Sequence, residues 1–167
     1  LILQFESRFS WRNGDEMQIN IERANPQDAK CLAEVYNASF YSDYVKYGEC
    51  PGYGKTEERI LAGMVKNIVY KIIANDIIVG VISVREETEH HYYLGALCII
   101  PDYANKGIGQ NAMLFLDREF PDAVHWTLET PTDKTQNHYF YKKFGYQVTK
   151  EYADGSVPIS LFERTVK

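Results

Sequence analysis

Regular spacing of hydrophobic residues predicts a strand followed by a helix near the start of the chain. Ile19 and Ile21 alternate with polar residues, which is typical of a strand with one buried face. Asn25 precedes Pro26, the pair expected at the N-cap and the first position of a helix. A hydrophobic stripe then recurs at i, i+3, i+4, i+7 and i+11, as on the buried side of a helix: Ala29, Leu32, Ala33, Tyr36 and Phe40.

The segment from 41 to 54 has the composition of turns and a loop. It reads YSDYVKYGECPGYG and contains four tyrosines, three glycines and one proline. Glycine and proline interrupt regular elements, so the sequence predicts irregular structure here and a second helix over about 56–66.

Three strongly apolar runs follow and predict neighbouring strands. Residues 68–74 and 77–85 are rich in β-branched residues, and Asn75-Asp76 between them predicts a tight hairpin. The second run is almost wholly apolar, which indicates a central strand covered on both faces. Residues 92–100 form the third run, which ends at Pro101.

The last third of the chain predicts two helices and three strands. The helices are expected over 107–120 and 135–144, and the strands over 125–129, 146–152 and 157–163. Gly145 stands where a helix C-terminal cap is expected. The order of all these elements predicts a mixed α/β sandwich with one central sheet.

Length and composition indicate one globular domain. A chain of 167 residues that is 45% hydrophobic and 25% charged is typical of a single folded domain. We expect residues 17–167 to form it, with residues 1–16 as an N-terminal extension or disordered arm. The net charge of -5 opposes a nucleic-acid surface, and no run is apolar for the roughly 18 residues of a membrane span. We therefore expect neither nucleic acid nor a membrane as a partner.

The cysteines and histidines show no disulfide or metal-binding pattern. They are Cys31, Cys50, Cys98, His90, His91, His125 and His138. No CxxC pair occurs and the number of cysteines is odd, so we expect free thiols in a reducing, cytoplasmic location. Residues 1–16 also lack the features of a secretory signal. No histidine has ligand spacing with an acidic or cysteine partner, so no metal is predicted.

The most informative segment is 97–112, which combines the end of a strand, a glycine-containing turn and the start of a helix. Unpaired backbone N–H groups at a helix N-terminus bind phosphate oxygens, helped by the positive end of the helix dipole. The segment therefore predicts a phosphate-binding cradle. Gly-x-Gly-x-x-Ala taken alone is a weak pattern, because ordinary strand-to-helix turns also satisfy it.

Two other phosphate-binding interpretations compete. Residues 107–112 satisfy the relaxed fingerprint of a dinucleotide-binding oxidoreductase, and Glu129 lies near the distance expected for its ribose-binding acid. That fingerprint closes the first βα turn of a parallel sheet, whereas here it follows three successive strands with no helix between them. Gly54-Lys55-Thr56 resembles the end of a P-loop, but Glu49 stands where that loop needs glycine.

A family resemblance joins this segment to a second motif. Residues 98–109 (CIIPDYANKGIG) resemble the coenzyme A signature of the GCN5-related N-acetyltransferases, the GNAT superfamily. Residues 137–146 (NHYFYKKFGY) are similar to the late helix of that family. With the element order, the resemblance covers the chain from about Met17 to its end. It implies a mixed, mostly antiparallel central sheet of about seven strands flanked by about four helices.

The resemblance implies how acetyl-coenzyme A is held. Backbone amides would bind its pyrophosphate at Asn105, Lys106, Gly107, Ile108, Gly109 and Gln110. Leu97, Cys98 and Ile99 would present main-chain groups to pantetheine and the thioester, where an amide also stabilises the oxyanion. The Cys98 side chain is expected to be buried in a strand rather than to act as a nucleophile.

Two later side chains have implied catalytic roles. Tyr141 matches the family tyrosine that protonates the departing thiolate, and a phenol with a pKa of about 10 suits that role. The alternative is an aromatic ring packed beside Phe140 and Phe144. Glu129 matches a glutamate that acts as the base in related ribosomal-protein acetyltransferases, and its alternative is a solvated carboxylate at a strand end. A base or a water relay is useful because an amine with a pKa of about 10.4 is mostly protonated at pH 7.

The chain departs from the family pattern at two positions. Ala104 stands where arginine or glutamine is usual, but the cradle is mostly backbone and Lys106 still offers charge. Lys134 stands where many members have an asparagine that bonds pantetheine, and Asn137 one turn later can replace it.

The sequence thus predicts an N-acetyltransferase that uses acetyl-coenzyme A and a primary amine of a small molecule or peptide, by direct attack. A non-catalytic domain that binds or senses acyl-coenzyme A is the alternative. The acceptor is left open by the sequence. Tyrosines in the 41–54 segment are expected either to line its pocket or to pack ordinarily. Members of this family often pair through edge strands, so a homodimer is compatible with the resemblance.

Overall fold

The computed structural model describes residues 5–10 and 16–166. The chain divides into two compact units. The first consists of the described residues up to Ser83 together with Ala96–Glu119, and the second consists of Val84–Gly95 together with the described residues from Phe120 onward. The strands over residues 77–88 and 91–99 pass through both units, and every other described element belongs to one unit.

Eight strands are hydrogen-bonded in the order β1-β2-β3-β4-β5-β6-β8-β7. Their bounds are β1 Phe5–Ser10, β2 Glu16–Arg23, β3 Ile68–Ala74, β4 Ile77–Thr88, β5 His91–Ile99, β6 His125–Pro131, β7 Gln147–Asp154 and β8 Val157–Thr165. β5 and β6 pair in parallel, whereas β1–β2, β2–β3, β6–β8 and β7–β8 are antiparallel. The mixed, mostly antiparallel sheet predicted from the sequence is confirmed.

Four α-helices lie in the described part of the chain, and none is long and apolar enough to cross a membrane. Their bounds are α1 Ala29–Tyr47, α2 Glu57–Lys66, α3 Ile108–Glu119 and α4 Thr135–Lys143. The predicted cap before α1 is confirmed, because the Asn25 side chain accepts a hydrogen bond from the Gln27 N–H at 3.0 Å. It opens a short 3-10 turn, Pro26–Asp28, that leads directly into α1.

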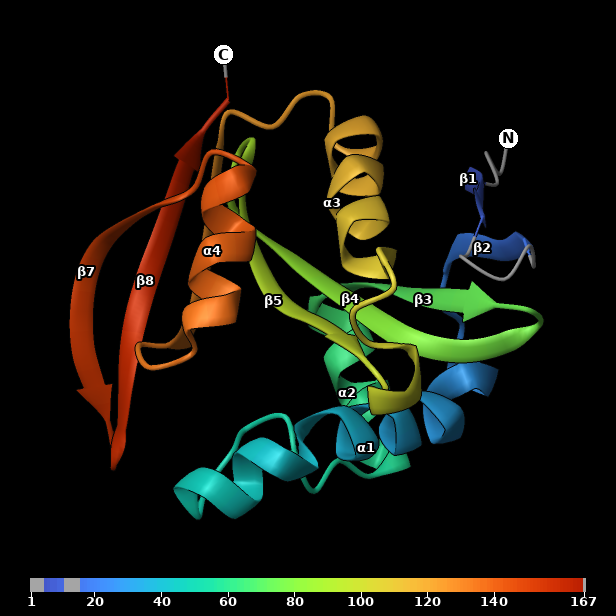
Figure 1. Cartoon of the computed structure of the whole chain (residues 1–167), viewed down its shortest axis with the longest axis horizontal. Coiled ribbons are helices and arrows are strands. Elements are labelled where there is room, and N and C mark those ends of the chain that lie inside the picture. The colour runs from blue at the N-terminus through green and yellow to red at the C-terminus, as the bar shows by residue number, and fades with distance from the viewer. Residues whose placement is uncertain (1–4, 11–15, 167) are drawn as a thin grey trace. The chain divides into compact units, whose positions relative to one another are not determined.

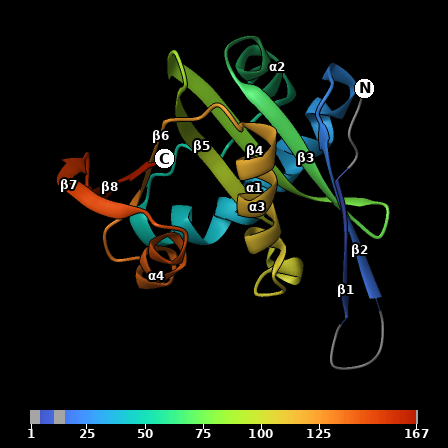
Figure 2. The same ribbon diagram turned by 90° about the horizontal axis from the view of Figure 1, so that it is seen from above.

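Strand β1 is an element that the sequence does not predict. Residues 1–16 are expected to be an extension or disordered arm, yet Phe5–Ser10 in that segment pair along β2 (Figure 2). The pairing occupies the backbone hydrogen-bonding groups of β2 that would otherwise form a sheet edge. Residues 1–4 and 11–15 lie outside the described residues. The assignment of 17–167 to a single domain stays a prediction.

In the first unit, helices cover both faces of β3 and the first half of β4 (Figure 1). α1 and α2 cover one face, where Leu32 and Ile60 share a buried cluster with Val69 of β3. On the other face, Tyr70 packs edge-on against Phe115 of α3, with ring centroids 5.0 Å apart. Consecutive residues of β3 therefore contribute to two hydrophobic layers, which explains why these strands are apolar on both sides.

Helix α1 continues past the point where the sequence predicts a loop. It ends at Tyr47, and Gly48 follows with a φ of 75°, its N–H donating to the Tyr44 carbonyl at 2.9 Å. The prediction of irregular structure is therefore wrong for 41–47. Tyrosine costs a helix little, and the residues that do break helices, glycine and proline, occur only from Gly48 onward.

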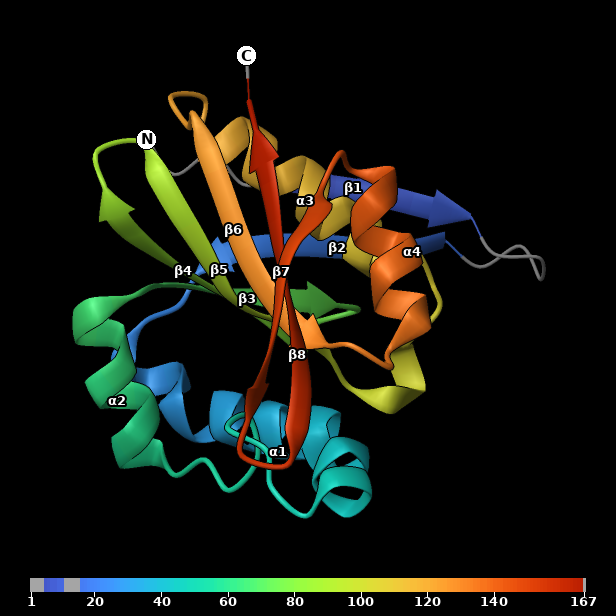
Figure 3. The ribbon, with the colours of Figure 1, turned by 90° about the vertical axis from the view of Figure 1, so that its left-hand side faces the viewer.

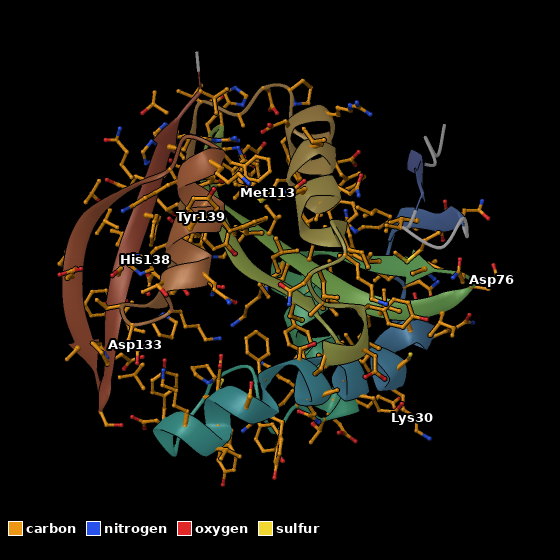
Figure 4. All side chains as sticks on the ribbon, viewed as in Figure 1. Lys30, Asp76, Met113, Asp133, His138 and Tyr139 are labelled. Carbon is orange, nitrogen blue, oxygen red and sulfur yellow. The ribbon has the colours of Figure 1, made fainter. Side chains whose placement is uncertain are left out.

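The turn between β3 and β4 is the tight hairpin predicted from Asn75-Asp76. Both residues have positive φ, 48° and 66°. Positive φ at both central residues defines the type I′ turn, whose twist matches that of the flanking strands. Figure 4 places Asp76 at the tip of this hairpin.

We expect the substitution Asp76→Gly to raise the free energy of unfolding by about 0.5 kcal/mol, because glycine adopts positive φ without a steric penalty. Urea unfolding followed by circular dichroism measures this change. Asp76→Ala is the matched control and should lower stability, since alanine lacks the polar group that helps aspartate tolerate this conformation. A glycine variant less stable than the parent would contradict the assignment of the turn.

In the second unit, α4 packs against β8 (Figure 3). Phe162 of β8 is fully buried, and its ring centroid lies 4.9 Å from that of His138 and 6.0 Å from that of Tyr141. β8 lies between β6 and β7, and β6 pairs with β5 through His91–Leu94. Gly145 follows α4 with a φ of 86°, which confirms the predicted cap.

Candidate functional site

The predicted phosphate cradle forms a continuous turn in the first unit. β5 ends at Ile99, a 3-10 turn covers Pro101–Tyr103, and α3 begins at Ile108. Between them Asn105 and Gly107 have left-handed backbones, with φ of 57° and 79°. Such alternation of backbone conformation turns successive N–H groups toward one side, and the first N–H groups of a helix have no acceptor within the helix.

Asn111 stabilises this turn through two hydrogen bonds to one carbonyl group. It is 3% exposed, and both its side-chain amide and its backbone N–H donate to the Gly107 carbonyl, at 3.0 and 3.2 Å. Ile108 and Ala112 are also buried and fix the first turn of α3 on the core. Sequence reasoning missed Asn111. The available signal was a polar residue directly before Ala112, a position that the helix buries.

The charges around the turn suit an anion. Lys106 is exposed, and its Nζ lies 5.6 Å from the centroid of the Tyr103 ring. Gly109 is half-buried and Gln110 is exposed, so the main chain at the start of α3 is not covered by bulky side chains. A flexible cation, a helix N-terminus and two left-handed residues together fit the pyrophosphate of a nucleotide cofactor.

The adjoining end of β5 brings two backbones unusually close. A Cβ atom added to Gly80 of β4 would lie 2.7 Å from the Cys98 carbonyl oxygen and 2.9 Å from Ile72 Cδ1. The Cys98 side chain is buried in the cluster beneath α1, and this burial raises the pKa of its thiol to about 12. Such a thiol stays protonated, which does not suit a nucleophile. Leu97 and Ile99, on either side, are half-buried.

The second unit carries the side chains with predicted catalytic roles. Tyr141 of α4 is 9% exposed, and its ring packs on Tyr146 and Phe162 with centroids 5.9 and 6.0 Å apart. Asn137 lies one turn earlier on the same helix, and its amide donates to Thr130 Oγ1 at 2.9 Å. The hydrogen bond and the ring contacts fix the orientation of α4 on the strands of this unit.

Glu129 is an exposed residue between two buried neighbours on β6. Its carboxylate accepts a hydrogen bond from the Tyr152 hydroxyl of β7. This hydrogen bond, followed by desolvation and the Glu129 charge, raises the pKa of Tyr152 to about 12. The structure thus adds Tyr152 to the predicted set, a residue that sequence reasoning did not single out.

The structure therefore groups the predicted residues by unit. Leu97 to Ile99 and the turn from Asn105 to Gln110 follow one another in the first unit. Glu129, Asn137 and Tyr141 belong to the second. The roles assigned to these residues stay predictions.

Two of the histidines of the second unit, His90 and His125, have carboxylate partners. His90 Nδ1 lies 2.8 Å from Asp122, and His125 Nε2 lies 3.4 Å from Glu163. Among residues 5–10 and 16–166, no group of three or more histidine, cysteine or acidic side chains has the arrangement to hold a metal ion.

The chain is similar in sequence to known acetyltransferase domains. The sequence model of the Acetyltransferase (GNAT) domain family matches residues 66–148, which include the cradle turn, Glu129 and Tyr141. The chain belongs to the GNAT superfamily. This GNAT protein is also 31% identical over 88 residues to YrkN of Bacillus subtilis strain 168. The aligned part covers 51% of the chain and 47% of YrkN, so the chain spans about half the length of that relative.

Solved structures confirm the GNAT fold. The PaiA N-acetyltransferase of Thermoplasma acidophilum, solved with coenzyme A, matches with a TM-score of 0.75 at 20% identity. That match covers 89% of this chain and 99% of PaiA. The ribosomal-protein-S18-alanine N-acetyltransferase of Escherichia coli matches with a TM-score of 0.72 at 12% identity, over 88% of this chain and 93% of that enzyme. The cytoplasmic location and the homodimer of this GNAT protein stay predictions.

Proposed function

We propose that this GNAT protein transfers an acetyl group from acetyl-coenzyme A to a primary amine of a small molecule or peptide. The observation that carries the proposal is the turn before α3, where Asn105 and Gly107 are left-handed and Asn111 anchors the Gly107 carbonyl. Its geometry suits a pyrophosphate, and the family membership of the chain favours coenzyme A over a dinucleotide.

In this proposal the first unit binds the acetyl donor. The amides of Asn105 to Gln110 hold the pyrophosphate, and Lys106 adds a positive charge. The main chain of Leu97, Cys98 and Ile99 bonds pantetheine and the thioester. An amide of this strand end also stabilises the negative charge that develops on the thioester oxygen, because fixed dipoles act strongly where water is scarce.

In the same proposal two side chains, Glu129 and Tyr141, move the protons. The acceptor nitrogen forms a bond to the acetyl carbonyl carbon while the carbon–sulfur bond breaks, and the sulfur leaves with the bonding electron pair. Glu129 takes the proton that the amine loses, directly or through a water molecule. Tyr141 gives its phenolic proton to the thiolate, and the phenolate oxygen that remains then takes a proton from solvent.

A thiol-release assay tests the proposal. We expect saturable release of coenzyme A that depends on a primary amine, measured across a panel of alkylamines, amino acids and peptides, with a coenzyme A binding titration in parallel. Binding without release for any amine would instead favour the non-catalytic acyl-coenzyme A sensor. Loss of both binding and release would overturn the assignment of coenzyme A.

A further inference from the structure

The second unit has a polar sheet face on the side away from α4. Glu129 pairs in register with Leu161, whereas the next residue, Phe162, packs beneath α4. Because side chains alternate along a strand, Glu129 lies on the opposite face from Phe162. Tyr93 of β5 pairs with Thr127, two residues before Glu129, so it lies on this same face. This face therefore carries polar side chains, as the solvated face of a mostly antiparallel sheet commonly does.

Three of these side chains form a mutual cluster. The Tyr152 hydroxyl donates to the Glu129 carboxylate, which orients both groups. Tyr93 is half-buried, and desolvation together with the nearby Glu129 charge raises the pKa of its phenol. Tyr93 in turn is near enough to Tyr152 to contribute to the raised pKa of Tyr152. Glu129, Tyr93 and Tyr152 are therefore mutual neighbours, and we call them the carboxylate–phenol cluster.

Two cations border this cluster, each over the ring of one of its tyrosines. Arg85 lies over the Tyr93 ring, 5.0 Å from its centroid, and forms an ion pair with Glu87 at 2.9 Å. Lys150 lies 5.7 Å from the centroid of the Tyr152 ring. Within the described residues Glu129 makes no ion pair of its own. Neither Arg85 nor Lys150 forms an ion pair with the Glu129 carboxylate, and Glu87 adds a second negative charge beside Tyr93.

We propose that the carboxylate–phenol cluster binds the acceptor as a primary ammonium ion that has no carboxylate next to its nitrogen. This inference rests on the proposed function and names its substrate class. An ammonium group donates three hydrogen bonds, and the Glu129 carboxylate and the oxygens of Tyr93 and Tyr152 supply three acceptors. A carboxylate on the adjacent carbon would be brought against Glu129 and is repelled.

The same arrangement prepares the amine for reaction. At pH 7 an alkylamine with a pKa of about 10.4 enters almost wholly as the ammonium ion. One N–H proton passes to a Glu129 oxygen and from there to solvent, and the electron pair of that N–H bond stays on nitrogen as the nucleophilic lone pair. Glu129 is then ionised again when the nitrogen loses its second proton on attack. Tyr152 acts as a positioning residue, because its hydrogen bond holds the carboxylate that receives the proton.

Butylamine and norvaline form the matched pair of acceptors, because norvaline is butylamine with a carboxylate on the carbon that bears the nitrogen. We expect wild type to prefer butylamine in kcat/KM. Glu129→Gln should reduce the ratio of kcat/KM for butylamine to kcat/KM for norvaline at least about fivefold, because it removes the repulsion between Glu129 and the norvaline carboxylate. A loss of base activity alone would lower both values together and leave the ratio unchanged, which would overturn the proposal.

Tyr152→Phe provides a second variant that keeps the ring. It should raise KM for butylamine about fivefold, the effect of one hydrogen bond, with the Kd of coenzyme A unchanged. Tyr139→Phe and Glu89→Gln are matched controls, because Tyr139 is 68% exposed on α4 and the Glu89 side chain is 88% exposed, and both should behave as wild type. An unchanged KM in Tyr152→Phe would remove that residue from the site.

An NMR titration with butylammonium chloride, without any acetyl donor, separates this inference from the proposed function. Amide shifts centred on residues 93, 129 and 152 that disappear in Glu129→Gln would establish the ammonium site even if no thiol release occurred. If coenzyme A is released with butylamine as acceptor, but no such shifts occur and the acceptor ratio is unchanged in Glu129→Gln, the proposed ammonium site is wrong. The proposed acetyltransferase activity would still stand.

Discussion

Replacing Tyr141 by phenylalanine should lower kcat for acetyl transfer about 100-fold, the lower end of what a positioned general acid contributes. The substitution removes one hydroxyl group and keeps the ring that packs on Tyr146 and Phe162. Thiolate release then depends on solvent for its proton. Because Tyr141 is also predicted to contact the cofactor, the Kd of coenzyme A should rise by no more than the effect of one hydrogen bond, about fivefold.

Stopped-flow thiol release at saturating amine and donor measures this effect. Tyr139→Phe is the control on the same helix: Tyr139 is exposed and adjacent to His138 (Figure 4), and its loss should leave kcat at the wild-type value. Equal thermal unfolding midpoints for both variants would exclude a packing defect. A Tyr141→Phe enzyme with full kcat would show that another group or water protonates the thiolate.

The parts of the fold that the sequence predicts well are those determined by neighbours along the chain. The Asn75-Asp76 hairpin follows from the tolerance of these residues for positive φ, and the cap at Asn25 follows from its side-chain oxygen. β1 has no such local signal, because its existence depends on pairing with β2 across a connection outside the described residues. The extension of α1 to Tyr47 is not predicted, because the glycines and the proline that break the helix occur only in the second half of the 41–54 segment.

The candidate site likewise has one part that depends on neighbours along the chain and one part that depends on the pairing of distant strands. The turn from Asn105 to Gln110 is contiguous, so its backbone follows from the preceding strand, the glycines and the start of the helix, and its binding role stays a prediction. The partnership of Glu129 with Tyr152 depends instead on the order β6-β8-β7, in which the two residues come from strands separated by a third. No periodicity along the chain encodes that placement. The close approach of Gly80 to Cys98 is likewise set by tertiary pairing, although a glycine within an apolar strand was a visible hint.

That close approach leads to the second large effect, expected for Gly80→Ala. The added Cβ would meet the Cys98 carbonyl oxygen at 2.7 Å, a backbone atom that cannot move aside as a flexible side chain can. Such overpacking should lower the free energy of unfolding by about 2 kcal/mol. The shift of β5 that relieves the contact displaces the main-chain groups assigned to pantetheine. The affinity for coenzyme A should therefore fall about tenfold, which corresponds to a loss of roughly 1.4 kcal/mol of binding free energy.

Isothermal titration with coenzyme A and urea unfolding measure the two effects of Gly80→Ala on the same samples. Gly63→Ala is the matched control, since the nearest neighbouring atom to its added Cβ, Asn67 Nδ2, lies 3.8 Å away. In the interior of α2, alanine should stabilise the protein by about 0.5–1 kcal/mol and leave coenzyme A binding unchanged. A Gly80→Ala variant that is destabilised but binds coenzyme A normally would separate the packing role of Gly80 from donor binding. It would show that the main chain at Cys98 does not hold pantetheine.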